Sequence, residues 1–179
     1  YLNAHLYNKD LETPMAYLDS VTLMLNPDHR YFNDLLEMHD LMVNYYADGT
    51  RSDRHAFATF FEAEGLIRQF KISEGLSMLQ SIQNYHPDAL ITPLATLRLA
   101  LLLIEFGQLD QALQVALSIE NSPIKDRGLV LAGEIEEKFL GNTQNALVYY
   151  NRLLAECPTS LLVEPVRLHI RKLSQPQES

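Results

Sequence analysis

The stretch FLGNTQNALVYYNRLLAECP, residues 139–158, decides the fold. It opens with a Gly-Asn turn, continues with Ala, Tyr and Leu at helical spacing, and closes on Pro158. Proline ends a helix because its ring blocks the preceding turn and its nitrogen carries no hydrogen to donate. The stretch therefore predicts one amphipathic helix that is bounded by a turn at each end.

Two earlier stretches, residues 70–87 and residues 106–123, follow the same plan. Each begins with an apolar residue and a turn, then places a small residue before Leu, and ends in Pro. Gly107 and Gly141 are 34 residues apart. A period near 34 residues with two helices in each period predicts a solenoid of helical hairpins. The small residue has a physical role, since Gly or Ala lets two backbones approach where the helices of a hairpin cross.

Apolar residues recur at helical spacing along most of the chain, and no stretch shows convincing strand alternation. Short linkers between the helical stretches predict that neighbouring helices run antiparallel. The predicted helices cover residues 11–25, 30–47, 53–69, 72–85, 90–105, 108–120, 124–139, 142–156 and 160–173.

This pattern resembles the tetratricopeptide repeat family, which places small residues, a turn glycine and a closing proline at fixed spacing. In the middle repeat these roles fall on Ala100, Leu103, Gly107, Ala112, Ala116 and, loosely, Pro123. In the last repeat they fall on Gly141, Ala146, Tyr150, Leu153 and Pro158. The first clear repeat has Phe70 in place of the turn glycine. The first helix of the last repeat is out of step by one residue, since Gly133 lies eight residues before Gly141.

The resemblance implies an all-α fold, a right-handed α-solenoid of antiparallel helix hairpins with a C-terminal closing helix. Residues 10–29 look like the second helix of an earlier repeat, so the helix at 30–47 leaves one helix too many. The predicted organisation is an irregular N-terminal repeat region at 1–52, three hairpins at 53–158, a capping helix at 159–173 and a tail at 174–179. Because the chain begins at Tyr1, we expect it to be part of a longer protein.

Composition disfavours several classes of partner. There are 23 acidic and 14 basic residues, so the formal net charge is −9, and an acidic surface repels nucleic acids and anionic membrane surfaces. The longest apolar run is interrupted by Arg98 and Glu105, which argues against a membrane span within the chain. Cys157 is the single cysteine, which excludes an internal disulfide and a thiolate zinc site. Its place at a helix C-terminus predicts a raised thiol pKa.

The strongest hint of an enzyme is the pair His39 and Asp40, with His5 and His29 upstream. All-helical phosphohydrolases of the HD family hold a metal with such residues, but no carboxylate-rich cluster accompanies the histidines here. The stretches 53–55 and 86–88 are typical of turns and helix N-caps, with Asp53 placed to accept backbone N–H groups of the helix that follows. We predict no catalytic, cofactor-binding or metal-binding residue, and we predict that the chain is not an enzyme.

In the resembled fold, one face of each first helix lines a concave groove. The corresponding positions are Phe60, Glu64, Leu97 and Leu101. If the three apolar side chains are exposed, they form an apolar groove for a protein or peptide; otherwise a neighbouring segment of the full-length protein fills it. No Lys or Asn occupies these positions, which excludes the carboxylate-clamp function of some family members.

We therefore expect a non-catalytic protein–protein interaction scaffold in a larger assembly. The alternatives are a structural or oligomerisation segment and, remotely, an HD-type metal-dependent hydrolase. The sequence of residues 149–173 is similar to the ends of bacterial cell-envelope tetratricopeptide proteins, which favours periplasm or envelope over cytoplasm. The closing helix has a basic end, which favours either charge complementarity at a helix C-terminus or an anionic partner; its basic residues are Arg167, His169, Arg171 and Lys172.

Overall fold

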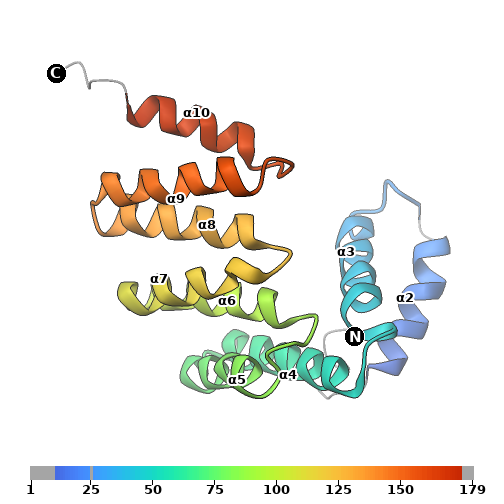
Figure 1. Cartoon of the computed structure of the whole chain (residues 1–179). Helices are drawn as coiled ribbons and strands as arrows, with labels where there is room; N and C mark the ends of the chain where they lie inside the picture. Colours follow the sequence, from blue (N-terminus) through green and yellow to red (C-terminus); the bar gives the residue numbers. More distant parts are fainter. Residues whose placement is uncertain (1–10, 25, 175–179) are drawn as a thin grey trace. The chain divides into compact units, whose positions relative to one another are not determined.

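The structure is a computed structural model that describes residues 11–24 and 26–174. These residues form helices joined by short turns and contain no strand, which confirms the predicted all-α class (Figure 1). Each predicted helix has an observed counterpart whose ends agree within three residues. Residues 1–10, which include His5, and the tail residues 175–179 lie outside the described residues.

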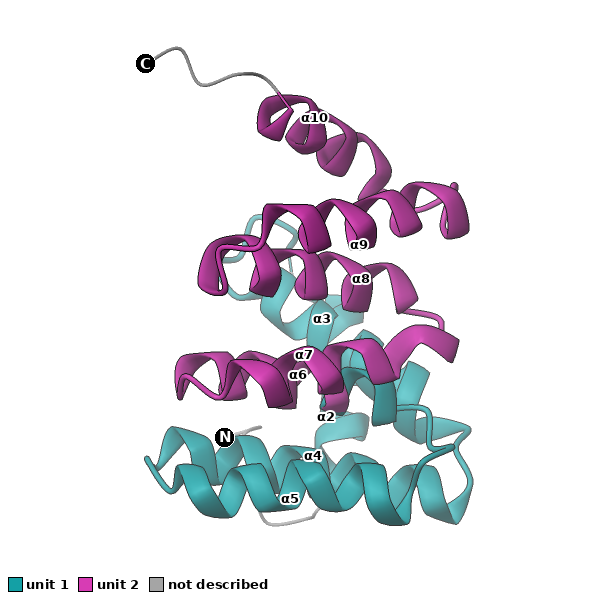
Figure 2. Ribbon diagram, turned by 60° about the vertical axis from the view of Figure 1, so that its left-hand side comes forward, with its two compact units in different colours: residues 1–95 teal, residues 96–179 magenta. Residues whose placement is uncertain are grey.

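The chain divides into two compact units, Tyr1–Ala95 and Thr96–Ser179 (Figure 2). The described part of the first unit holds two helix pairs. In the first pair α2 (Glu12–Met24) packs against α3 (Phe32–Met42), which continues into a π-helical turn, η1 (Val43–Ala47). The helices of the second pair are α4 (Arg51–Arg68) and α5 (Ile72–Tyr85).

α2 packs against α3, and the assignment of residues 10–29 to the second helix of an earlier repeat stays a prediction. The buried side chains Leu18 and Met42 lie on these two helices. The Nε2 atom of His39 on α3 lies 3.0 Å from a carboxylate oxygen of Asp19 on α2. This contact joins the two helices at the surface. Within the described residues, the helix predicted at 30–47 therefore pairs with α2.

The second unit is a stack of antiparallel helices, and α10 packs against α9 at its C-terminal end (Figures 1 and 2). Two of its helices change type in their last turn, one to a 3₁₀-helix and one to a π-helix. The elements are α6 (Thr92–Glu105, which contains the unit boundary), α7 (Leu109–Leu117) with η2 (Ser118–Asn121), α8 (Lys125–Glu134) with η3 (Ile135–Phe139), α9 (Thr143–Glu156) and α10 (Val163–Leu173).

Glycines lie where helices approach most closely, as the sequence predicts. A Cβ atom on Gly133 of α8 would lie 2.3 Å from the Tyr150 ring of α9, which is closer than two carbon atoms can come. A Cβ atom on Gly128 would lie 2.7 Å from the carbonyl oxygen of Ala116 in α7. In the first unit, a Cβ atom on Gly75 would lie 2.6 Å from Ile67. Alanines on four of the helices are also fully buried; they are Ala63, Ala100, Ala112 and Ala146.

The last repeat is out of step because of the π-helical turn η3. Seven residues separate Ala100 from Gly107, and eight separate Gly133 from Gly141. A π-helix closes its hydrogen bonds one residue further along the chain than an α-helix. The turn of this hairpin widens accordingly, with the amide of Asn142 donating to the carbonyl of Glu136 at 2.7 Å. The extra residue therefore sits in η3, and both small positions keep their packing role.

The helix at 53–69 begins two residues earlier than predicted, and Asp53 is not its N-cap. Thr50 is the N-cap, and Asp53 closes a capping box, accepting the Thr50 amide at 2.8 Å. The other carboxylate oxygen of Asp53 accepts the amide of Leu90 at 2.8 Å, so this buried side chain ties the start of α4 to the turn before α6. Hydrogen bonds from the Thr50 hydroxyl and the Leu90 amide hold the pKa of Asp53 below its usual range.

Each of the three hairpin turns contains one residue with a left-handed backbone conformation, and Phe70 holds the position that glycine holds in the other two turns. The φ angle is 61° at Phe70, 70° at Gly107 and 67° at Gly141. The amides after the first two close the same bond, Lys71 to Leu66 and Gln108 to Leu103. Left-handed backbone costs a residue with a side chain about 1–2 kcal/mol, so Phe70 carries strain that the two glycines avoid.

Replacing Phe70 with glycine is expected to raise the free energy of unfolding by about 1 kcal/mol, since the strain disappears. The ring is 89 % exposed, so little packing is lost. Urea denaturation monitored by circular dichroism measures the change in the free energy of unfolding. Gly107→Ala is the matched control and is expected to lower stability by a similar amount, because alanine is strained at a φ of 70°. No neighbouring atom lies within 4 Å of the added methyl group, so a steric clash does not contribute. A loss of stability in Phe70→Gly would contradict the left-handed turn.

Candidate functional site

A hollow of about 310 Å³ lies between the first helices of two successive hairpins, α6 and α8 with its extension η3. Both helices belong to the second unit, and the lining comes from their facing sides. The lining residues are Arg98, Leu101, Ile104, Glu105, Leu131, Glu134, Lys138 and Phe139.

Helical spacing places these side chains together. On α6, Leu101 follows Arg98 by three residues and Glu105 follows Leu101 by four, which puts all three on one face. On α8, Glu134 follows Leu131 by three residues, and Lys138 follows one turn later. Each helix therefore presents one row of side chains to the hollow.

The surface of the hollow is apolar in its middle and charged at its rim. Leu101 is 39 % exposed and Phe139 is 52 % exposed, so two large apolar side chains in one hollow remain open to solvent. The carboxylate of Glu134 accepts a hydrogen bond from the Lys138 ammonium one turn away. Such a surface favours contact with an apolar side chain over contact with a charged one.

Of the four residues predicted to line a groove, two lie on α6 and two lie on α4, and the groove itself stays a prediction. Leu101 lines the hollow, whereas Leu97, one turn earlier on α6, is partly buried and is not among the lining residues. Phe60 and Glu64 lie on α4 in the first unit; Phe60 is 8 % exposed, and its ring packs edge-on against Phe61 with the centroids 5.6 Å apart. The second helix of the hollow is missing from the prediction, although the helical spacing around Gly133 provides a signal for it.

The histidines of the HD interpretation have local roles. His39 lies beside Asp19 and, at 4.0 Å, beside Asp40. His29 is exposed and accepts the amide of Tyr31 on its Nδ1 atom. Within residues 11–24 and 26–174, no group of three His, Cys, Asp or Glu side chains is arranged to hold a metal ion.

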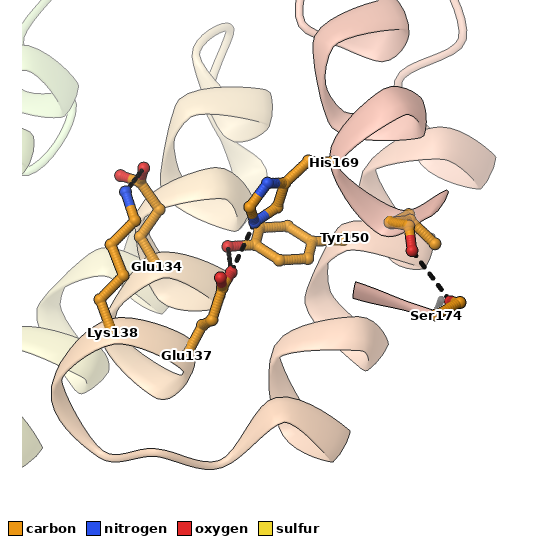
Figure 3. A network of polar contacts seen from close by, with 7 residues as sticks. Glu134, Glu137, Lys138, Tyr150, His169 and Ser174 are labelled. Atoms are coloured by element: carbon orange, nitrogen blue, oxygen red, sulfur yellow. Dashed lines mark hydrogen bonds and ion pairs between the residues drawn. The ribbon is translucent and has the colours of Figure 1, made fainter. Parts of the chain in front are cut away.

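Glu134 and Lys138 form an intrahelical ion pair, whereas Glu137 makes contacts with other helices. Its carboxylate lies between α9 and α10, where it accepts the Tyr150 hydroxyl at 2.8 Å and contacts Nε2 of His169 at 2.7 Å (Figure 3). The ring of Tyr150 meets that of His169 edge-on. This polar cluster joins three elements of the second unit and fixes the closing helix to the last hairpin.

The cluster shifts the pKa values of two of its members. Burial opposes ionisation of Glu137, but the hydrogen bonds from His169 and Tyr150 outweigh it and hold its pKa below the usual range. Burial, followed by the Glu137 carboxylate, raises the pKa of Tyr150 well above its usual range. Glu137 is therefore the carboxylate and Tyr150 the neutral donor at neutral pH.

A pKa that is lower in the folded protein predicts that Glu137 stabilises the fold above its unfolded pKa, and that this contribution disappears as the pH falls through the folded pKa. We expect wild-type protein to lose stability steadily from about pH 5 downward. Glu137→Gln is expected to be less stable at pH 7 and to show a flatter decline. Urea midpoints measured from pH 7 to pH 3 check this. Parallel curves for the two proteins would contradict the role of the carboxylate.

The other residues singled out at the C-terminus are distributed over the surface. Arg167 pairs with Glu164 one turn earlier on α10, and Arg171 and Lys172 are exposed in its last turn. The thiol pKa of Cys157 is raised, as expected, although burial is the main cause and the nearby Asp126 carboxylate comes next. None of the helices in the described part of the chain has the length and apolar character needed to cross a membrane.

Comparison with known proteins supports the repeat interpretation for one hairpin. Residues 128–160 match the family model described as Tetratricopeptide repeat. This segment covers most of α8, η3, all of α9 and the turn that follows, including Gly133 and Tyr150. No curated protein and no solved structure matches the chain. The match supports a tetratricopeptide repeat family and suggests a protein–protein interaction scaffold. Repeats of this family are generally not catalytic.

Proposed function

We propose that the chain is a non-catalytic scaffold whose hollow between α6 and α8 receives a large apolar side chain of a partner protein. The observation that carries the proposal is the half-exposed pair Leu101 and Phe139 in one hollow on the first helices of two successive hairpins. Binding energy at protein interfaces concentrates where an apolar anchor enters a desolvated pocket. These two side chains supply the walls of such a pocket.

The size of the hollow favours a side chain over a free metabolite. A volume of about 310 Å³ is at the lower end of the range for small-molecule sites. Its apolar middle provides a single place for Leu, Phe or Met, and the remainder of the partner lies across α6 and α8. An extended or helical segment that carries one such anchor fits this surface.

The charged rim selects the residues that flank the anchor. Arg98 and Lys138 are basic, while Glu105 and Glu134 are acidic. A partner with charges of both signs beside its anchor is favoured, because rim charges act on orientation and association rate more than on affinity. Binding is therefore expected to depend weakly on salt.

The test is selection from a displayed peptide library against wild-type protein, followed by affinity measurement with a double variant, Leu101→Asp with Phe139→Asp. Selected peptides are expected to share one large apolar residue and to lose at least tenfold in affinity with the double variant. Leu168→Asp is the matched control, because Leu168 is 54 % exposed on α10 and lies outside the hollow. It is expected to bind normally. Circular dichroism verifies the fold of each variant.

Two results would reject the proposal. In the first, the peptides bind the double variant as well as they bind wild type, or their addition shifts backbone amide signals in nuclear magnetic resonance spectra only outside α6, α8 and η3. In the second, no peptide is enriched and the same substitutions lower the stability of the longer natural protein, which indicates that another of its segments fills the hollow. That second result would favour the structural alternative.

The larger assembly and the envelope location are further parts of the proposal. They rest only on the resemblance that was drawn from the sequence of residues 149–173. Fractionation of cells that express the longer natural protein, with detection in cytoplasmic and periplasmic fractions, tests the location. Recovery in the cytoplasmic fraction alone would reject it.

A further inference from the structure

Two histidines that are 31 residues apart in the chain meet at the surface of the first unit. His55 lies in the second turn of α4, and His86 is the C-cap of α5. The Nδ1 atom of His55 lies 3.0 Å from the Nε2 atom of His86, and the ring centroids are 4.9 Å apart with the planes tilted by 40°. His55 is exposed and His86 is partly buried, so solvent reaches the pair.

Ser52 contacts the other nitrogen of His86. Its Oγ atom lies 2.8 Å from Nδ1 of that ring, one turn before His55 on α4. When the hydroxyl accepts the Nδ1–H, the lone pair of Nε2 is directed at His55. Histidines that bind metals usually donate their second ring N–H in this manner, which fixes the tautomer and the ring orientation.

The spacing of the two nitrogens fits a shared metal ion. Imidazole nitrogens lie about 2.0–2.1 Å from Zn²⁺, so two of them on one ion are about 2.9 Å apart at a right angle and about 3.3 Å apart at the tetrahedral angle. The observed 3.0 Å lies within this range. The same range suits Cu²⁺, for which imidazole is a favoured ligand.

The positive charge of Arg54, the residue before His55, is held by other contacts and does not occupy the space between the two histidines. The guanidinium of Arg54 donates to the carbonyl of Ala47 at 2.9 Å and lies over the Tyr46 ring, 5.3 Å from its centroid. In the described residues no third His, Cys, Asp or Glu joins the pair to form a larger group. An ion bound here keeps water in its remaining positions and exchanges readily.

We propose that His55 and His86 form a two-histidine site for a divalent transition metal ion, Cu²⁺ or Zn²⁺, with Ser52 as the residue that positions His86. The site lies in the first unit, and the hollow lies in the second, so each proposal can fail without the other. An ion at this place links α4 to the end of α5.

The experiment uses the whole chain without a histidine tag, titrated with CuCl₂ or ZnCl₂ in a calorimeter. Wild-type protein is expected to bind one equivalent, and the electron paramagnetic resonance spectrum of the Cu²⁺ form is expected to show nitrogen couplings from two imidazoles. His55→Gln and His86→Gln are each expected to weaken binding at least tenfold, and Ser52→Ala about tenfold. His29→Gln, at an exposed histidine elsewhere in the unit, is expected to bind as wild type does.

The proposal is overturned if wild-type protein binds neither ion, which would show that the pair is joined by an N–H···N hydrogen bond alone. It is also overturned if the double variant, His55→Gln with His86→Gln, still binds the ion, since the ion then binds elsewhere. Circular dichroism verifies folding. If His86→Gln does not fold, the exposed His55→Gln variant decides the outcome.

Discussion

Replacing Tyr150 with alanine is expected to lower the free energy of unfolding by about 3–5 kcal/mol, the usual cost of removing a large aromatic ring from a core. Tyr150 is 1 % exposed and packs with Leu129, Leu153 and Val166 in the core of the second unit. The substitution leaves a cavity between α8, α9 and α10 and also removes a hydrogen bond from the Glu137 carboxylate.

Urea denaturation measures this loss, and native-state hydrogen exchange is expected to localise it to α8, α9 and α10, because repeat arrays couple mainly to their neighbours. Two control variants separate the contribution of the buried ring from that of the hydrogen bond. Tyr149→Ala changes the adjacent, partly buried ring and is expected to cost less. Tyr150→Phe keeps the ring and is expected to cost about 1.5–3 kcal/mol, the range for a hydrogen bond to a charged group. Equal losses for Tyr149→Ala and Tyr150→Ala would contradict the packing described here.

Replacing Gly133 with alanine is expected to destabilise the protein by about 2–3 kcal/mol. The sign is the informative part, because alanine is the better helix former by about 1 kcal/mol and would stabilise a helix with free space at this position. Here the added methyl group meets the Tyr150 ring at 2.3 Å. That ring cannot move aside without breaking its hydrogen bond to Glu137 and opening the core.

A double-mutant cycle isolates the contact. Tyr150→Leu makes room beside Gly133, so Gly133→Ala is expected to cost at least 1 kcal/mol less in the Tyr150→Leu protein than in wild type. Urea midpoints of the four proteins provide the coupling free energy. Additive effects of the two substitutions would show that α8 and α9 do not approach at this pair.

Local chemistry made much of the fold predictable. The prolines and turn glycines mark helix ends, and the small residues at fixed spacing mark the helix contacts, so the hairpins could be read from the chain alone. Phe70 fits the same account, because its place in the repeat required a left-handed turn and the φ angle of 61° has that sign. Such features depend on residues that are close together in the sequence.

Features that depend on hydrogen-bond geometry or distant residues could not be read in this manner. The π-helical turn before Gly141 changes the register by one residue without a distinct composition. The Glu137 and His169 contact joins side chains 32 residues apart, and neither residue type specifies its partner. The same holds for His55 and His86, whose meeting follows from the antiparallel packing of α4 on α5.

The predicted groove stays a prediction, and the structure adds only where its residues lie. Leu101 lines the hollow, whereas the burial of Phe60 at 8 % exposure depends on packing that family spacing does not reveal. Phe139 was missed because the π-helical turn shifts the residues that follow Gly133. The part of the site on α8 therefore required coordinates.

The central claim is that successive helices pack through glycine contacts into hairpins. Nuclear Overhauser spectroscopy on the whole chain tests it directly through three pairs: Gly75 with Ile67, Gly128 with Ile119, and Gly133 with Tyr150. We predict strong cross-peaks between the glycine α-protons and the partner side chains in all three. Absence of these cross-peaks in a folded, helical protein would contradict the hairpin packing from which the rest of the account follows.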